Sequence, residues 1–184
     1  MSQSTNQKQW IETGFELFVR EGHEGIQIER LSRILRKNKS GFYHYFGNLD
    51  NYFQALMQHH ILLTDEFVAD IEDAKDFDPG FLLAMVKHKE VVMGHMQLIR
   101  NRHIKLFADT FSETSRKVDL ALLPLWIKHI EVTDNAEAAL RYFEMIRDMF
   151  FSRITFETLH YDYLHAMASG AKTIILTLQK NNSS

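Results

Sequence analysis

The chain of 184 residues lacks cysteine altogether. This absence excludes disulfide frameworks, thiol nucleophiles, iron–sulfur clusters and zinc sites built on cysteine. Long apolar runs are also missing, because the longest one, 120–127, is far shorter than a membrane span. The first twenty residues lack the basic start and apolar stretch of a secretion signal. We therefore expect a cytoplasmic protein that does not enter a membrane.

Proline and strand-like patterns are scarce. Only two prolines occur, Pro79 and Pro124, and alternation of apolar and polar residues is hard to find. Apolar residues instead recur at helical spacing, and a hydrophobic share of 45% allows a packed core. Five of the eight glycines lie in the first 47 residues, which indicates frequent turns early in the chain. The sequence predicts an all-α protein in which short helices come first and long ones follow.

The spacing of apolar residues also predicts the extent of each helix. We expect helices over 7–21, 28–35, 39–46, 49–70, 79–99, 111–130, 135–158 and 161–180, with a short piece at 103–107. Pro124 is expected to bend the helix over 111–130. Asn48 is suited to cap the helix that follows it, and Asp134 or Asn135 to cap the helix over 135–158.

Charge is distributed unevenly along the chain, although the formal net charge is only −3. Residues 26–48 hold five basic side chains and one acidic side chain, a net charge of +4. Residues 49–184 hold 14 basic and 19 acidic side chains, a net charge of −5. A basic island in an acidic protein indicates a local site for a polyanion, and the alternative is a solvated helix face.

The basic island coincides with two short predicted helices that are separated by a tight turn and preceded by a third. This order is typical of a helix-turn-helix unit. The second helix of such a unit enters the major groove of DNA, and its flanks place basic and hydroxyl groups on phosphates. The pattern favours DNA as the partner of residues 1–48.

The stretch GIQIERLSRILRKNKSGFYHYF at 25–46 resembles the DNA-binding domain of tetracycline-repressor (TetR) family regulators. The most specific pieces are the F-x-x-x-G pattern at 18–22 and the Y-x-x-F pattern at 43–46. Detailed similarity covers roughly residues 8–60, and the remainder is similar only in length and helical character. The resemblance implies an all-α chain with a three-helix DNA-binding domain over 1–48 and a helical effector-binding and dimerisation domain over 49–184.

The resemblance also implies a homodimeric transcription factor, usually a repressor, on a palindromic double-stranded DNA operator. A small, largely apolar effector in the second domain would release the operator, without enzymatic activity or a cofactor. The DNA-contacting positions that the resemblance implies are Gln27, Lys39, Ser40, Gly41, Tyr43, His44 and Tyr45, with the recognition helix over 39–45. For Tyr43, the alternative to a phosphate contact is a position in the core. Phe42 and Phe46 are expected in the core. Arg30 and Arg33 are expected to be solvated rather than base-reading.

The chain departs from the family pattern in and around the turn. Arg36 replaces the family's turn glycine, and Lys37 replaces the apolar residue that follows. Leu49 stands where the family has a phosphate-binding lysine, and Gln27 or Ile28 where it has a threonine. We expect phosphate contacts to shift toward the turn, where Arg36 and Lys37 supply them. A family member with weakened DNA binding that acts through protein contacts is one alternative.

The ten histidines raise the possibility of a metal or catalytic site. His59 and His60 are adjacent and therefore point about 100° apart on a helix. His88 and His95 share a helix face but lie two turns apart, roughly 10 Å by helical rise. We expect no metal site, because no H-E-x-x-H pair is present. The alternative is a small all-helical enzyme or metal-binding protein with its site in the carboxy-terminal bundle.

The carboxy-terminal half offers candidates for an effector pocket and for a dimer interface. Abundant Phe and Met favour a soft apolar cavity, in which His103, Trp126 and Arg147 would orient a ligand. The helix over 135–158 is apolar nearly all round, so it lines the pocket, packs in the core, or does both. We expect it to form a four-helix bundle with the last helix across a two-fold axis. The predicted interface residues are Phe150, Ile154, Ala168, Gly170, Ala171 and Ile174.

Overall fold

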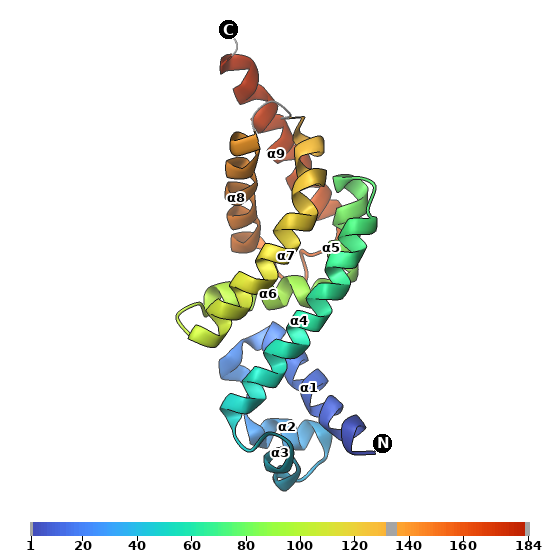
Figure 1. Ribbon diagram of the computed structural model, residues 1–184, viewed down its shortest axis with the longest axis vertical. Helices are drawn as coiled ribbons and strands as arrows, with labels where there is room; N and C mark the ends of the chain where they lie inside the picture. The colour runs from blue at the N-terminus through green and yellow to red at the C-terminus, as the bar shows by residue number, and fades with distance from the viewer. Residues whose placement is uncertain (1, 132–135, 183–184) are drawn as a thin grey trace. The chain divides into compact units, whose positions relative to one another are not determined.

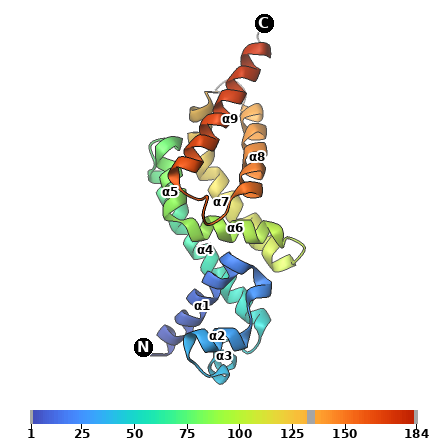
Figure 2. The same cartoon turned by 180° about the vertical axis from the view of Figure 1, so that it is seen from behind.

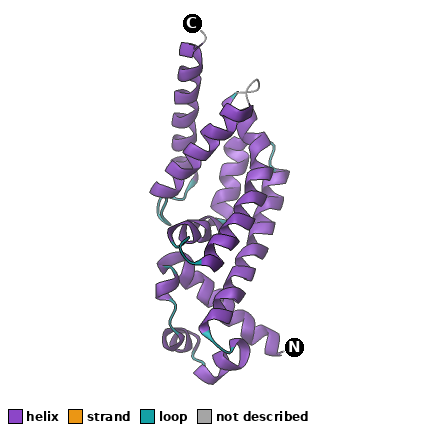
Figure 3. Cartoon of the chain, turned by 60° about the vertical axis from the view of Figure 1, so that its left-hand side comes forward, coloured by secondary structure: helices purple, strands orange, loops and turns teal. Residues whose placement is uncertain are grey.

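The computed structural model describes residues 2–131 and 136–182 (Figure 1). These residues fold into helices joined by short turns (Figure 3), which confirms the all-α prediction. Within the same ranges, no helix combines the length and the apolar character that crossing a membrane requires.

The chain divides into two compact units, each built from two separate segments. The first unit comprises Met1–Thr64 with Glu90–Thr114, and the second comprises Asp65–Lys89 with Ser115–Ser184. This division differs from the predicted boundary after residue 48, because the first part of the following helix and a later helix pack with the amino-terminal helices.

The first unit begins with α1 (Ser2–Glu21), the single turn η1 (His23–Gly25), α2 (Ile28–Leu35) and α3 (Lys39–Phe46). The bounds of α2 and α3 agree with the sequence prediction, whereas α1 begins earlier than predicted. Its core is aromatic and aliphatic and includes Trp10, Phe15, Phe18, Leu31, Phe42, Phe46 and Tyr52. Phe42 and Phe46 are buried, which confirms the core role predicted for them.

The helix α4 (Leu49–Asp73) follows α3 after a two-residue turn. Gly47 adopts a left-handed φ of 73° and ends α3 with a bond from its N–H to the Tyr43 carbonyl. The Asn48 side chain then accepts a hydrogen bond of 2.8 Å from the N–H of Asn51. Asn48 therefore caps α4 as predicted.

The helix α6 (Lys89–Arg100) completes the first unit together with the first part of α7 (Lys105–Ile130). Every residue of α6 from 91 to 98 is buried. The Gln97 side chain donates a hydrogen bond of 3.3 Å to the Val19 carbonyl at the end of α1. Residues distant in sequence thus support the amino-terminal helices.

The second unit contains the turn η2 (Phe77–Phe81), α5 (Leu82–Lys87), α8 (Ala136–Arg153) and α9 (Tyr161–Asn182), which Figure 2 shows from behind. Trp126 of α7 is central to this unit: its indole N–H donates to the Ala139 carbonyl at 3.1 Å. The Trp126 ring packs on Phe77 and Phe143, with ring centroids 5.3 and 6.1 Å away. These contacts join α7 to η2 and to α8.

Three helix predictions need correction. The helix expected over 79–99 is two helices, α5 and α6, which are separated at His88 (φ −98°, ψ 40°). At this break the Asp70 carboxylate of α4 lies 2.5 Å from both the Lys87 ammonium and the His88 ring, so His88 makes a long-range polar contact.

The pieces expected at 103–107 and 111–130 form one helix, α7, which continues through Pro124. The helix predicted over 135–158 ends at Arg153. Its predicted caps, Asp134 and Asn135, lie outside the described residues.

Candidate nucleic-acid interface

The turn between α2 and α3 closes on Arg36 in the left-handed conformation, with φ 54° and ψ 42°. The N–H of Arg36 bonds to the Arg33 carbonyl at 3.2 Å, and the N–H of Lys37 bonds to the Ser32 carbonyl at 2.9 Å. This pair of bonds is the usual ending of a helix that has glycine at the left-handed position. Arg36 therefore occupies the left-handed position that glycine usually takes at a helix end, at a conformational cost of about 1–2 kcal/mol.

All nine residues predicted to contact DNA have solvent-accessible side chains or backbone on the first unit. Gln27, Arg36, Lys39, Ser40, Tyr43 and His44 are exposed, and Lys37, Gly41 and Tyr45 are half-buried. Tyr43 is 52% exposed, so the structure does not place it in the core. Its ring meets Phe42 edge-on at 5.7 Å, which anchors the base of an otherwise outward-facing side chain.

Several cations of the basic island already have partners within the first unit. Lys39 lies 2.5 Å from the carboxylate of Glu29 on α2, and its hydrogen bond lowers the pKa of Glu29. Lys37 donates to the side chains of Asn6, at 2.8 Å, and Gln9 on α1. A polyanion that binds these lysines must therefore replace contacts that the chain makes to itself.

Arg30 is partly exposed to solvent and also has a structural role. Its guanidinium forms a two-pronged pair with the Glu21 carboxylate, the longer contact being 2.6 Å. This pairing lowers the pKa of Glu21 and raises that of Arg30. Because Glu21 ends α1, the pair connects α1 to the middle of α2.

Gly41 lies inside α3, where the fold itself does not require glycine. A Cβ at this position would meet no heavy atom within 4 Å, and the backbone is helical. Glycine inside a helix costs about 0.5–1 kcal/mol relative to alanine. A helix position without a side chain lets a partner approach the backbone closely.

The three residues suggested for an effector pocket do not converge in either unit. His103 is exposed in the turn that precedes α7 in the first unit, so it lines no interior cavity there. Trp126 and Arg147 belong to the second unit. Arg147 pairs with Asp119 at 2.8 Å and lies over the Phe143 ring at 5.6 Å. Burial raises the pKa of Asp119 even though Arg147 opposes that shift.

The residues suggested for a dimer interface fall into two groups. Ile154, Ala168 and Ala171 are buried within the second unit itself, so this part of the prediction needs correction: their side chains pack in its core. Gly170 and Ile174 are exposed on α9, and Phe150 of α8 is half-buried. Leu140 and Met145 are further exposed apolar side chains of the second unit.

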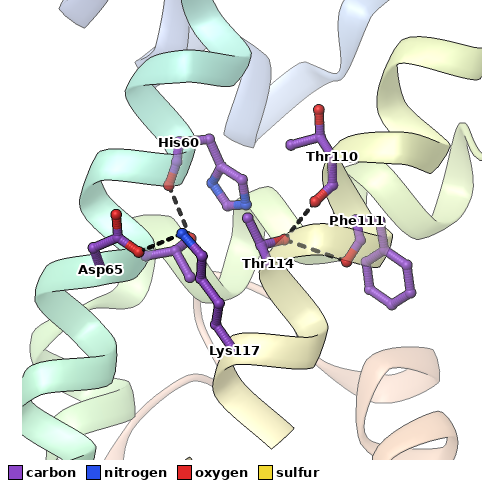
Figure 4. A network of polar contacts seen from close by, with 7 residues as sticks. His60, Asp65, Thr110, Phe111, Thr114 and Lys117 are labelled. Carbon is purple, nitrogen blue, oxygen red and sulfur yellow. Dashed lines mark hydrogen bonds and ion pairs between the residues drawn. The ribbon is translucent and has the colours of Figure 1, made fainter. Parts of the chain in front are cut away.

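Sequence reasoning missed a buried polar cluster in the first unit. Its members are His60, Thr64, His95, Thr110 and Thr114, all at most 5% exposed. Thr64 and Thr114 donate their hydroxyl hydrogens to backbone carbonyls one turn earlier, at 2.8 Å (Figure 4). The available signal was the position of His60 and His95 on otherwise apolar helix stripes. Among the described residues, no group of three or more His, Asp or Glu side chains is arranged to hold a metal ion.

Comparison with known protein families finds no match to this chain, and comparison with curated proteins finds none either.

Proposed function

We propose that the chain is a sequence-specific, DNA-binding transcriptional regulator of the tetracycline-repressor type. In this proposal α3 enters the major groove, and α2 with the turn at Arg36 lies along the phosphate backbone. Lys39, Ser40 and Gly41 face the bases, while Arg36, Lys37 and Tyr43 face phosphates. A small effector, largely apolar, releases the operator.

The observation that carries the proposal is the α2–turn–α3 geometry. Two eight-residue helices meet at a turn whose arginine adopts the conformation of a glycine. Within five residues, the solvent-accessible part of α3 then presents a cation, a hydroxyl, a bare helix backbone and an exposed tyrosine ring. This set of groups suits base edges and phosphates, because DNA is read by donors in the groove and held by cations and hydroxyls beside it.

The proposal includes a homodimer that presents two copies of α3. Exposed apolar side chains on α8 and α9 of the second unit support it: Leu140, Met145 and Ile174. Gly170 also leaves open space beside α9, because a Cβ there would meet no heavy atom within 4 Å. A two-fold dimer predicts an operator with two inverted half-sites.

Selection from a randomised pool of double-stranded oligonucleotides tests the proposal, carried out at about 0.15 M salt so that non-specific binding is reduced. We expect enrichment of an inverted repeat. Bulk binding that disappears with salt, with no enriched sequence, would contradict sequence-specific recognition. Refolding the protein beforehand removes any bound effector that would mask binding.

Two substitutions on α3 then test the assigned contacts on the enriched sequence. Lys39→Ala is expected to weaken binding and to relax the preference at one base pair, whereas Tyr43→Phe is expected to weaken binding evenly across sequences. Unchanged affinity in both variants would show that α3 is not the recognition helix. Metal analysis of the purified protein tests the alternative of a metal-dependent enzyme.

A further inference from the structure

Two histidines from different helices lie against each other inside the first unit. The ring centroids of His60 on α4 and His95 on α6 are 4.9 Å apart. His60 is completely buried and His95 is 5% exposed. Neither ring nitrogen of His60 makes a hydrogen bond with any described residue. Such a pair is costly to charge, because a buried cation needs a partner or water.

The His60 ring is enclosed by neighbouring helices and has no contact with bulk solvent. A Cβ on Gly94 of α6 would lie 2.9 Å from two atoms of the His60 ring, so the imidazole fills the space beside that glycine. The Phe15 ring of α1 lies 5.7 Å away. Figure 4 shows the imidazole pointing toward Thr114 of α7, whose hydroxyl hydrogen is donated to the Thr110 carbonyl. Three helices thus enclose the ring.

The titratable groups that act on the pKa of His60 are two other histidines. They are His95 from α6 and His59 from α4, while α1 and α7 face it with Phe15 and Thr114. Burial first, then His95 and His59, hold the pKa of His60 well below its ordinary value. Because the folded pKa of His60 is lowered, its neutral ring contributes stability at pH values above the unfolded pKa of about 6.5. That contribution is lost as the pH falls below this value.

We propose that the His60–His95 pair is an acid-sensitive latch that holds α4 against α6 and α1. Taking up a proton requires the ring to reach water, which the closed packing prevents, so acid favours an opened form of the first unit. The same α1 and α4 also carry the candidate DNA surface: Tyr52 of α4 donates to the Trp10 carbonyl at 2.6 Å. Opening therefore weakens DNA binding, and this last step alone rests on the proposed function.

The latch is testable without DNA, because each unit contains one buried tryptophan: Trp10 in the first and Trp126 in the second. In a Trp126→Phe background, Trp10 fluorescence reports the first unit. Urea unfolding is measured at intervals from about pH 7.5 down to about pH 5, with and without His60→Leu. His103→Gln is the matched control, because it removes an exposed imidazole from the same unit.

As the pH falls below about 6.5, we expect the unfolding equilibrium constant of the parent to rise more steeply than that of His60→Leu, with the difference approaching about tenfold per pH unit, the effect of one proton. The control should keep the parent's pH dependence. Identical pH dependence in the parent and His60→Leu would overturn the latch.

If His60→Leu does not fold, amide hydrogen exchange of the natural chain replaces it. After correction for intrinsic rates, exchange in α4 around His60 and in α6 should accelerate as the pH falls, and uniform behaviour across both units would overturn the latch. DNA affinity is measured separately over the same pH range. Failure to bind DNA at any pH contradicts the proposed function and leaves the structural result standing. Binding that stays constant while the first unit opens contradicts only the regulatory step.

Discussion

The hydroxyl group of Tyr52 occupies the space that a side chain on Gly14 would fill. A Cβ on residue 14 would lie 1.7 Å from that oxygen, which donates a hydrogen bond to the Trp10 carbonyl. Burial raises the pKa of Tyr52, so the phenol stays protonated as a donor. Its ring packs edge-on against Phe42 and Phe46 of α3, at 4.9 and 4.8 Å. One side chain thus connects α1, α3 and α4.

Gly14→Ala is expected to destabilise the chain by about 1–3 kcal/mol, because the new methyl group displaces the Tyr52 ring. Helix propensity alone predicts the opposite, since alanine is favoured over glycine by about 1 kcal/mol inside a helix. Urea unfolding followed by circular dichroism measures the difference. A stabilised variant would mean that Tyr52 moves aside without loss.

Gly41→Ala provides the contrasting case in the same unit. With no atom within 4 Å of the new methyl group, we expect a gain of about 0.5–1 kcal/mol in the free energy of unfolding. DNA affinity should nevertheless fall at least several-fold, because the methyl group prevents close approach to α3. Urea unfolding measures the change in the free energy of unfolding, and a binding titration on the selected operator measures the change in affinity. Unchanged affinity would show that no partner approaches the backbone at residue 41.

Glu29→Gln releases Lys39 from its ion pair on the exposed surface. We expect DNA to bind several-fold more tightly at low salt, because Lys39 no longer has to break its ion pair with Glu29 before it contacts DNA. Stability should change little, since exposed pairs contribute little. Fluorescence anisotropy at two salt concentrations measures the effect. Lys39→Ala combined with Glu29→Gln should abolish the gain; persistence of the gain would place its origin elsewhere.

Two substitutions at Arg36 separate conformation from charge. Arg36→Gly relieves the left-handed strain and should stabilise the first unit by up to about 1 kcal/mol. Arg36→Ala keeps the strain and should leave stability nearly unchanged. Both variants lose the cation, so both should reduce the slope of log affinity against log salt by about 0.9 if Arg36 neutralises one phosphate. An unchanged slope in both variants would remove Arg36 from the interface.

Ile174→Glu tests the proposed dimer. Ile174 is 60% exposed on α9, so a charged side chain there should leave the fold of one chain intact. In a dimer that buries this position, the same charge would lose its hydration and destabilise the interface. Sedimentation at micromolar concentration is expected to show a dimer for the natural chain and a monomer for the variant. The control is Leu120→Glu on α7, where the residue is 71% exposed but was not predicted at the interface. A dimer that tolerates both changes would use another surface.

Local patterns predicted the amino-terminal helices well because local interactions determine them. The stripe of Ile28, Leu31 and Leu35 and the turn at Arg36 define α2, and the Asn48 side chain starts α4. The buried positions of Phe42 and Phe46 on α3 follow from helical spacing, and so do the exposed positions between them.

Long-range contacts explain what the sequence did not predict. The break at His88 coincides with a contact to Asp70, which lies 18 residues earlier and on another helix. The burial of Ala168 and Ala171 depends on which face of α9 packs in the second unit, and small residues are compatible with both core and interface. The juxtaposition of His60 and His95 depends on the tertiary packing of α4 against α6.

The contribution of α6 to the first unit has a practical consequence for engineering. A fragment that stops at Thr64 ends before α6 begins at Lys89. It lacks Gln97, which bonds to Val19 and lies beside Gly22, and it lacks Gly94, which accommodates His60. A single cut in the gene therefore separates the amino-terminal helices from α6, which packs with them in the first unit. Under the proposed function, a new operator preference has to be introduced by exchanging surface residues of α2 and α3 within the whole chain.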